Sequence, residues 1–315
     1  MTNYSQLTAE FQTLLDFLRF GLTQAHAHSL HFGHGTDNAW DDILALILES
    51  LHLPYDLEPH FLQARLTVEE KEALTTQLAK RILEKIPVPY LTNTAHFCQL
   101  PFYVDNRVLI PRSPIGELIQ TQFSPWISSN KVDHILDLCT GSGALAIACH
   151  HAFPDALIDA TDISDDALEV AAINCERHEV GDNVRLIRSD AWENVPDIRY
   201  AIIVSNPPYV GQAEMETLPK EYYHEPRIAL EASDDGLAII STILFNAHHY
   251  LQDEGVLIME VGNSEPVVEA AFPQLAFTWL EFEKGGQGVF LLTKKQLEDY
   301  FDTGSNHPVI NEITD

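Results

Sequence analysis

Apolar residues recur at helical spacing through the first part of the chain. Those between Leu7 and Leu22 fall every three or four positions and predict one helix. A second apolar pattern, over residues 40–51, predicts another helix, and either Asp37 or Asn38 can serve as its N-cap.

A third helix is predicted to begin at Thr67. Thr67 and Glu70 have the spacing of a capping box, and an apolar face follows them. Pro87 and Pro89 are expected to close this helix, because proline removes a main-chain donor and clashes with the preceding turn. Residues 1–90 are therefore expected to form a helical bundle of their own.

The next segment, residues 91–117, reads as a connector in β conformation. Two apolar runs at residues 100–104 and 108–110 flank Asp105-Asn106, a dipeptide that favours a tight turn. A β-hairpin centred on that turn is the prediction.

From residue 118 to about residue 300, apolar runs that predict strands alternate with helical patterns. The predicted strands are residues 134–138, 157–161, 184–188, 201–205 and 256–261. This alternation predicts an α/β fold with a doubly wound, mostly parallel sheet.

Two final apolar runs complete the predicted sheet. Residues 277–282 and 289–293 are separated by Gly285-Gly286-Gln287-Gly288, too short a link for a crossover helix, so they predict an antiparallel hairpin at one side of the sheet. The sheet would then have seven strands within a domain of residues 118–301. A mobile acidic tail is expected over residues 302–315.

The charge balance of the 315-residue chain is unusual. There are 18 Lys and Arg against 47 Asp and Glu, for a formal net charge of −29. Such a surface repels phosphate backbones and attracts basic proteins, although acidity can equally serve solubility or a salty habitat. The sequence shows neither a signal peptide nor an apolar run of the roughly 18 residues that a membrane span needs. Its four cysteines form no C-x-x-C pair, so we expect a cytoplasmic protein.

Four histidines cluster near the amino terminus, at His26, His28, His31 and His34. Glycines interrupt the segment, and no carboxylate or cysteine completes a recognisable set of ligands, so no metal site is predicted. These histidines are expected at solvated or capping positions.

Polar loops follow three consecutive predicted strands. The first, Asp137 to Gly143, is a glycine turn that opens a helix; it lets the backbone approach a ligand, although a turn without a ligand has the same sequence. Asp162, after the second strand, can accept hydrogen bonds from both hydroxyls of a ribose. Asp190, after the third, is placed to accept one from the amine of an adenine, and Ala191 would add main-chain contacts.

A fourth strand stops abruptly at Asn206-Pro207-Pro208-Tyr209, because two successive prolines cannot continue a central strand. The Asn206 side chain and the Pro207 carbonyl can each accept a hydrogen bond from an NH₂ group. The face of Tyr209 can lie against a planar π system. We interpret this sequence as a clamp for a planar nitrogen group.

In this order, the four loops resemble the class I methyltransferases that use S-adenosylmethionine, and within them the enzymes that methylate planar amino or amide nitrogens. Residues 81–91, residues 102–112 (FYVDNRVLIPR) and residues 206–210 (NPPYV) resemble the family that methylates glutamine side chains in translation proteins. After the arginine, release-factor enzymes of this family usually carry proline-glutamate-threonine-glutamate. Here the continuation is SPIGEL (residues 113–118). Together with residues 32–42 (FGHGTDNAWDD), 224–230 (HEPRIAL) and 260–266 (EVGNSEP), it resembles the branch that modifies large-subunit ribosomal protein three.

The resemblance implies roles for individual residues. It implies S-adenosylmethionine as cofactor, with a binding site made of Asp137, Cys139, Thr140, Gly141, Ser142, Gly143, Asp162, Ile163, Asp190, Ala191 and Asn206. The implied catalytic residues are Asn206, Pro207 and Tyr209, and the implied substrate-binding residues are Phe102, Pro208 and Arg112. Phe102 and Tyr209 would sandwich the glutamine amide, and residues 1–90 would recognise the substrate protein.

The expected substrate is ribosomal protein three before ribosome assembly, with no direct nucleic-acid substrate and no membrane partner. Glutamine methylation of a peptide-chain release factor is the main alternative. Adenine-N6 methylation of nucleic acid is disfavoured by the charge and by the absence of a basic stripe. A ribosome assembly factor without catalytic activity is a further alternative.

Overall fold

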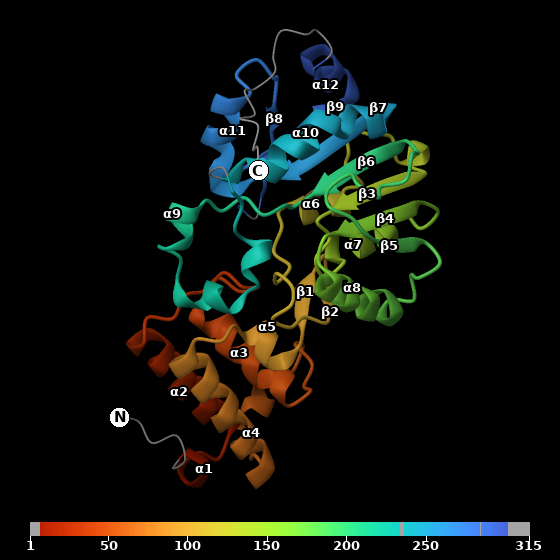
Figure 1. Ribbon diagram of the computed structural model, residues 1–315. Coiled ribbons are helices and arrows are strands. Elements are labelled where there is room, and N and C mark those ends of the chain that lie inside the picture. Colours follow the sequence, from red (N-terminus) through yellow and green to blue (C-terminus); the bar gives the residue numbers. More distant parts are fainter. Residues whose placement is uncertain (1–6, 234–235, 284, 302–315) are drawn as a thin grey trace.

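The structure is a computed structural model that describes residues 7–233, 236–283 and 285–301 (Figure 1). The acidic tail predicted at residues 302–315 lies outside these residues. Helices of the first 92 residues form a bundle at one end of the molecule, and a sheet with helices on both faces forms the other end. A segment that follows strand β6 lies between the two parts.

The bundle contains the predicted helical segments together with short additional turns. Its elements are α1 (Leu7–Glu10), α2 (Leu14–Ala27), α3 (Ala39–Ser50), the 3₁₀ turn Pro59–Gln63, α4 (Val68–Ala79), a π-helical turn Lys80–Glu84 and α5 (Val88–Thr92). Phe17, Leu46, Leu74 and Leu78 are fully buried in a core that is separate from the two cores of the sheet.

Local capping explains where these helices begin. The single helix predicted from Leu7 to Leu22 is wrong, because Thr13 starts a new helix with a capping box to Asp16. Of the two candidates for the second cap, Asn38 accepts the main-chain N–H of Asp41 at 2.9 Å. The capping box predicted at Thr67 is present.

Pro87 and Pro89 were expected to end the third helix and to be followed by a β connector, but the structure differs. They open α5 instead, with Pro89 in its first turn, where the missing N–H would have had no helical partner.

The connector hairpin is displaced from its predicted turn. Strand β1 (Ala95–Phe97) pairs antiparallel with β2 (Leu100–Phe102), and Cys98 and Gln99 make the turn with φ values of 49° and 66°. Positive φ at both central residues matches the right-handed twist of the strands. The Asp105-Asn106 dipeptide is a turn outside any sheet, so the predicted pairing of residues 100–104 with 108–110 is wrong.

Side chains from elsewhere in the chain replace strand pairing in the rest of the connector. The amide of Asn174 bonds both the N–H and the carbonyl of Tyr103, at 2.7 and 3.0 Å. The carboxylate of Glu225 accepts the N–H of Ile110 at 3.0 Å. These partners satisfy the main chain of an irregular segment in which Val104, Val108 and Ile110 are buried.

The sheet confirms the predicted topology. Its strands are β3 (His134–Leu138), β4 (Leu157–Asp162), β5 (Val184–Arg188), β6 (Tyr200–Ser205), β7 (Leu251–Glu260), β8 (Thr278–Trp279) and β9 (Val289–Thr293). Their order is β5-β4-β3-β6-β7-β9-β8, and only the pairs that involve β9 are antiparallel. The final hairpin therefore lies at one edge, as predicted.

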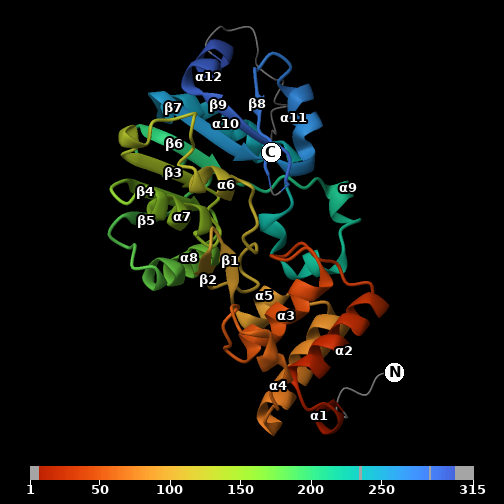
Figure 2. The same cartoon turned by 180° about the vertical axis from the view of Figure 1, so that it is seen from behind.

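Alternate residues of the strands build separate cores on the two faces of the sheet. On one face, Ile135 and Ile202 pack with α6 (Ile115–Gln120) and α7 (Ala144–Ala152), and α8 (Asp165–Arg177) lies beside α7. On the other, Leu136 and Ile203 pack with α10 (Ala238–Tyr250), α11 (Glu265–Ala271) and α12 (Lys294–Phe301). Figure 2 shows these three helices from behind, beside strands β7 to β9. No helix in the described part of the chain is long and apolar enough to cross a membrane.

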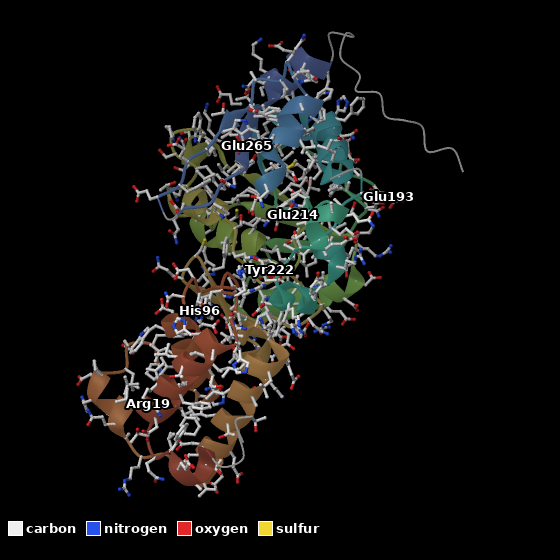
Figure 3. All side chains as sticks on the ribbon, turned by 90° about the vertical axis from the view of Figure 1, so that its left-hand side faces the viewer. Arg19, His96, Glu193, Glu214, Tyr222 and Glu265 are labelled. Carbon is white, nitrogen blue, oxygen red and sulfur yellow. The ribbon has the colours of Figure 1, made fainter. Side chains whose placement is uncertain are left out.

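Ion pairs join the bundle to the segment that follows β6. Arg81, which is 1% exposed, contacts Asp42 within the bundle at 2.8 Å and lies 3.7 Å from Glu221 of the 3₁₀ turn Lys220–His224. The N–H of His31 also donates to Glu221. Tyr222 from the same turn is labelled in Figure 3, between the bundle and the sheet.

The histidine cluster is only partly as expected. His26 and His28 are exposed, but His34 is buried, with its ring 4.5 Å from that of Tyr222 and its Nε2 3.4 Å from Glu225. The correction follows from the glycine-bounded loop, which turns this histidine towards the segment after β6 rather than towards solvent.

We predict that Asp42→Asn destabilises the protein by about 3 kcal/mol, because it leaves the Arg81 guanidinium buried with less compensating charge. Denaturant unfolding measures the loss. The exposed Asp56 provides a control, since Asp56→Asn should change the unfolding free energy by less than about 0.5 kcal/mol. Equal stability of the two variants would contradict the prediction.

Candidate functional site

A cavity of about 310 Å³ lies at the carboxyl ends of strands β3 to β6. Its floor comes from the loops after these strands. Phe97 with residues 107–109 and 111–113 of the connector forms one wall, and residues 228, 229 and 231–233 with the start of α10 form another. In an open α/β sheet this is the edge at which ligands bind.

Most of the residues predicted for the site line this cavity. They are Cys139, Thr140, Gly141, Ser142, Asp162, Ile163, Asp190, Ala191, Asn206, Pro208 and Arg112. Five other predicted residues, namely Asp137, Gly143, Pro207, Tyr209 and Phe102, are not among its lining.

Asp162 holds the glycine turn in place. One of its carboxylate oxygens accepts the N–H of Gly141 and the other accepts that of Ser164, each at 2.9 Å. Each oxygen keeps a further lone pair for a ligand. Burial raises the pKa of Asp162, and the main-chain donors counteract this effect.

Asp137 lies beneath the glycine turn, in the protein interior. Its Oδ2 accepts the Thr140 hydroxyl at 2.6 Å and the N–H of Ala146 at 3.1 Å. Burial raises the pKa of Asp137 to about 7, against the lowering effect of these two donors. Asp137 therefore shapes the loop and the start of α7 through Oδ2, while its buried Oδ1 has no partner among the described residues. Its place among the cofactor contacts stays a prediction.

Two polar side chains in the cavity are free to bind a ligand. Asn206 and Asp190 both line it, and within the described ranges no side chain or main-chain group hydrogen-bonds to the Asn206 amide or to the Asp190 carboxylate. Ser205, just before Asn206, donates its hydroxyl to the carbonyl of Leu138 at 2.8 Å. This bond fixes the end of β6 against the end of β3.

The aromatic pair predicted to sandwich an amide is not present in the structure. Phe102 is fully buried in the core beneath the sheet, 5.0 Å from the ring of His178, because the pleat of β2 turns it inward. Phe97 from β1 is the connector aromatic that lines the cavity. The Tyr209 ring packs against Gly262, where an added Cβ would lie 2.6 Å from the ring.

Arg112 lines the cavity, but its guanidinium is committed to another residue. It donates two hydrogen bonds to the carboxylate of Glu225, at 2.6 and 2.7 Å, and lies over the ring of Tyr222. Burial alone would raise the pKa of Glu225, but Arg112 and His34 lower it to about 2. Arg112 thus joins the connector to the segment after β6.

Several residues important to the geometry were missed by reasoning from the sequence. Asn174 on α8 donates to the carbonyl of Ser142 at 2.8 Å while it also bonds Tyr103, so it links the glycine turn to the connector. Two ion pairs were also missed: Glu225 pairs with Arg112, and Arg107, which lines the cavity, pairs with Glu169. No local signal marks Asn174, whereas Glu225 lies in a segment that carried the family resemblance.

Comparisons with known proteins are consistent with this geometry. Residues 123–230 match the family model of the methyltransferase small domain. The chain is 43% identical over 291 residues to the ribosomal protein uL3 glutamine methyltransferase of Francisella tularensis. This alignment covers 92% of this chain and 93% of that protein. It is 48% identical over 295 residues to the protein of the same name from Neisseria meningitidis, in an alignment that covers 93% of this chain and 97% of that protein.

Among solved structures, a methyltransferase from Pyrococcus furiosus aligns with a TM-score of 0.46 and 16% identity, over 73% of this chain and 99% of that one. The family model and the strand order agree with the class I methyltransferase fold expected from the sequence.

The lowered pKa of Glu225 predicts an acid-sensitive joint. A carboxylate whose pKa is lower in the folded than in the unfolded state stabilises the fold above its unfolded pKa of 4.5, and the stabilisation is lost as the pH falls towards 2. We expect the unfolding free energy of the wild type to fall over this range by roughly 3 kcal/mol more than that of Glu225→Gln. Parallel pH profiles of the two proteins would contradict this expectation.

Proposed function

We propose that this chain, which belongs to the family of the ribosomal protein uL3 glutamine methyltransferases, transfers a methyl group from S-adenosylmethionine to the side-chain amide nitrogen of a glutamine in ribosomal protein uL3. The observation that carries the proposal is the meeting, in one cavity, of the glycine turn, two carboxylates and the unpartnered Asn206 amide. The identity to both relatives extends over nearly the whole chain, including the bundle.

The polar groups of the cavity fit the proposed cofactor. Asp162 offers carboxylate oxygens for the ribose hydroxyls, Asp190 a free carboxylate for the adenine amine, and the turn at Gly141 open space for close approach. S-adenosylmethionine supplies an electrophilic methyl group on a sulfonium. The protein supplies binding, orientation and electrostatics.

A glutamine amide is a poor nucleophile because its nitrogen lone pair is delocalised into the carbonyl. The side chain of Asn206 and the carbonyl of Pro207 would accept the two amide hydrogens and so aim the nitrogen. These acceptors also stabilise the positive charge that the nitrogen acquires as the methyl group arrives. The proton leaves for water after transfer, so the step needs no dedicated base.

Recognition of the substrate protein is assigned to the bundle of residues 1–90. The net charge of −29 favours a basic protein and disfavours RNA, so free uL3 in the cytoplasm, before ribosome assembly, is the proposed form of the substrate. Deletion of the bundle is not a clean test of this assignment, because Arg81 and His34 contact the segment that borders the cavity.

The first test is direct. The protein is incubated with methyl-labelled S-adenosylmethionine in four separate reactions. Each contains one candidate substrate: purified uL3, a release factor, RNA or assembled large subunits. We expect label on a glutamine of free uL3 and little label elsewhere. Label confined to the release factor or to RNA would overturn the substrate assignment, and label on assembled subunits alone would overturn its timing.

Two variants should separate binding from transfer. Asn206→Ala removes an acceptor for the amide and should lower kcat by about a hundredfold while leaving the cofactor Kd within about twofold. Full turnover by Asn206→Ala would refute its proposed role.

Asp162→Ala should instead raise the cofactor Kd at least about tenfold in titration calorimetry, since it removes a proposed ribose contact and a support of the glycine turn.

A further inference from the structure

Glu260 lies at the carboxyl end of β7, and its side chain enters the protein rather than the solvent. The residue is 7% exposed, and β7 pairs in parallel with β6, which leads into Asn206. The Glu260 carboxylate accepts hydrogen bonds from two hydroxyl groups, that of Ser113 at 2.6 Å and that of Tyr209 at 3.1 Å.

The two hydroxyls come from segments that are far apart in sequence. Ser113 belongs to the connector and lines the cavity, and its oxygen also accepts the N–H of Ile115 at the start of α6. Tyr209 follows Asn206, Pro207 and Pro208 in the loop after β6. Glu260 is therefore a single point at which the connector wall and the loop of the amide clamp are held together.

Other contacts leave the Tyr209 ring little freedom. Gly262 packs on the ring at a distance that no side chain would permit, and Ser264 donates its hydroxyl to the Tyr209 carbonyl at 2.8 Å. With the phenol anchored at Glu260, both ends of this residue are fixed. The preceding three residues are thus tied to Ser205 on one side and to Tyr209 on the other.

We propose that Glu260 is a positioning residue for methyl transfer, which holds Asn206 and the Pro207 carbonyl in register with the cavity through Tyr209 and Ser113. This inference rests on the proposed function, because it assigns to those two acceptors the orientation of the glutamine amide. Orientation is costly to lose, since a misplacement of about 1 Å can lower a rate by a hundredfold. Burial raises the pKa of Glu260, while Ser113, Tyr209 and Arg112 oppose that effect.

The sheet contains a matched control for this arrangement. Asp159 on β4 is 5% exposed and accepts the hydroxyl of Tyr200 at 2.7 Å, so it too is a buried carboxylate that anchors a tyrosine. Neither Asp159 nor Tyr200 lines the cavity. Asp159 also pairs with Arg185 at 2.7 Å, so Tyr200→Phe reports the cost of losing the tyrosine bond alone, and neither substitution touches the clamp.

The experiment compares Glu260→Gln, Ser113→Ala and Tyr209→Phe with the controls Asp159→Asn and Tyr200→Phe. We expect Glu260→Gln to lower kcat on the order of tenfold to a hundredfold, with the cofactor Kd within about twofold of the wild type. Adding Ser113→Ala or Tyr209→Phe to Glu260→Gln should cause little further loss, because residues that act through one carboxylate are not additive. The controls should keep kcat.

Hydrogen exchange gives a readout that does not depend on activity. In Glu260→Gln, main-chain amides at residues 209–210 and 115–117 should exchange faster, whereas in Asp159→Asn the change should lie in β4 and β6. Unchanged exchange at both segments would overturn the proposal even if the wild type proves inactive on uL3. A Glu260→Gln protein with wild-type kcat and a loss of stability like that of Asp159→Asn would also overturn it, since the role would then be structural only.

Discussion

Parallel pairing of β3 with β4 and β6 is the constraint on which the site depends. Leu138 is opposite Thr161 on one side and Ser205 on the other, so the three strands end at the same level of the sheet. The glycine turn and Asn206 follow directly after the ends of β3 and β6, and Asp162 is the last residue of β4. Because each strand is buried on both faces by a separate core, a shift of register would expose apolar residues, and the relative height of the loops is fixed.

Buried polar side chains complete what the strand register begins. The walls of the cavity come from the connector and from the segment after β6, neither of which pairs with the sheet as a named strand. Asn174 and Glu225 hold these irregular segments by bonding their main chain or their charged side chains. Such groups are costly to bury without partners. Because moving either segment would leave a buried polar group unpartnered, each of these side chains holds two distant segments together.

The sequence was sufficient where periodicity and short-range chemistry decide the outcome. The strands 134–138, 184–188 and 289–293 were predicted at the bounds that the structure shows, since each is a short stretch rich in apolar residues. The capping box at Thr67 depends only on a neighbour three residues away. By contrast, the turn at Asp105-Asn106 matched a hairpin pattern, yet the real hairpin turns at Cys98 and Gln99, and distant side chains partner the rest of the connector.

The sequence by itself determined the succession of strands and loops along the chain and the parallel, doubly wound sheet. It thereby placed the glycine turn, Asp162, Asp190 and Asn206 at one edge, because parallel strands that follow one another through helices end at a common edge. The tertiary structure alone decided which aromatic reaches the cavity, where Phe97 replaces Phe102, and which charges are already paired, as Arg112 is with Glu225. It also decided that Tyr209 is anchored by Glu260. The pairing of Arg112 with Glu225 and that of Tyr209 with Glu260 join residues more than 50 positions apart, for which a single sequence carries no local signal.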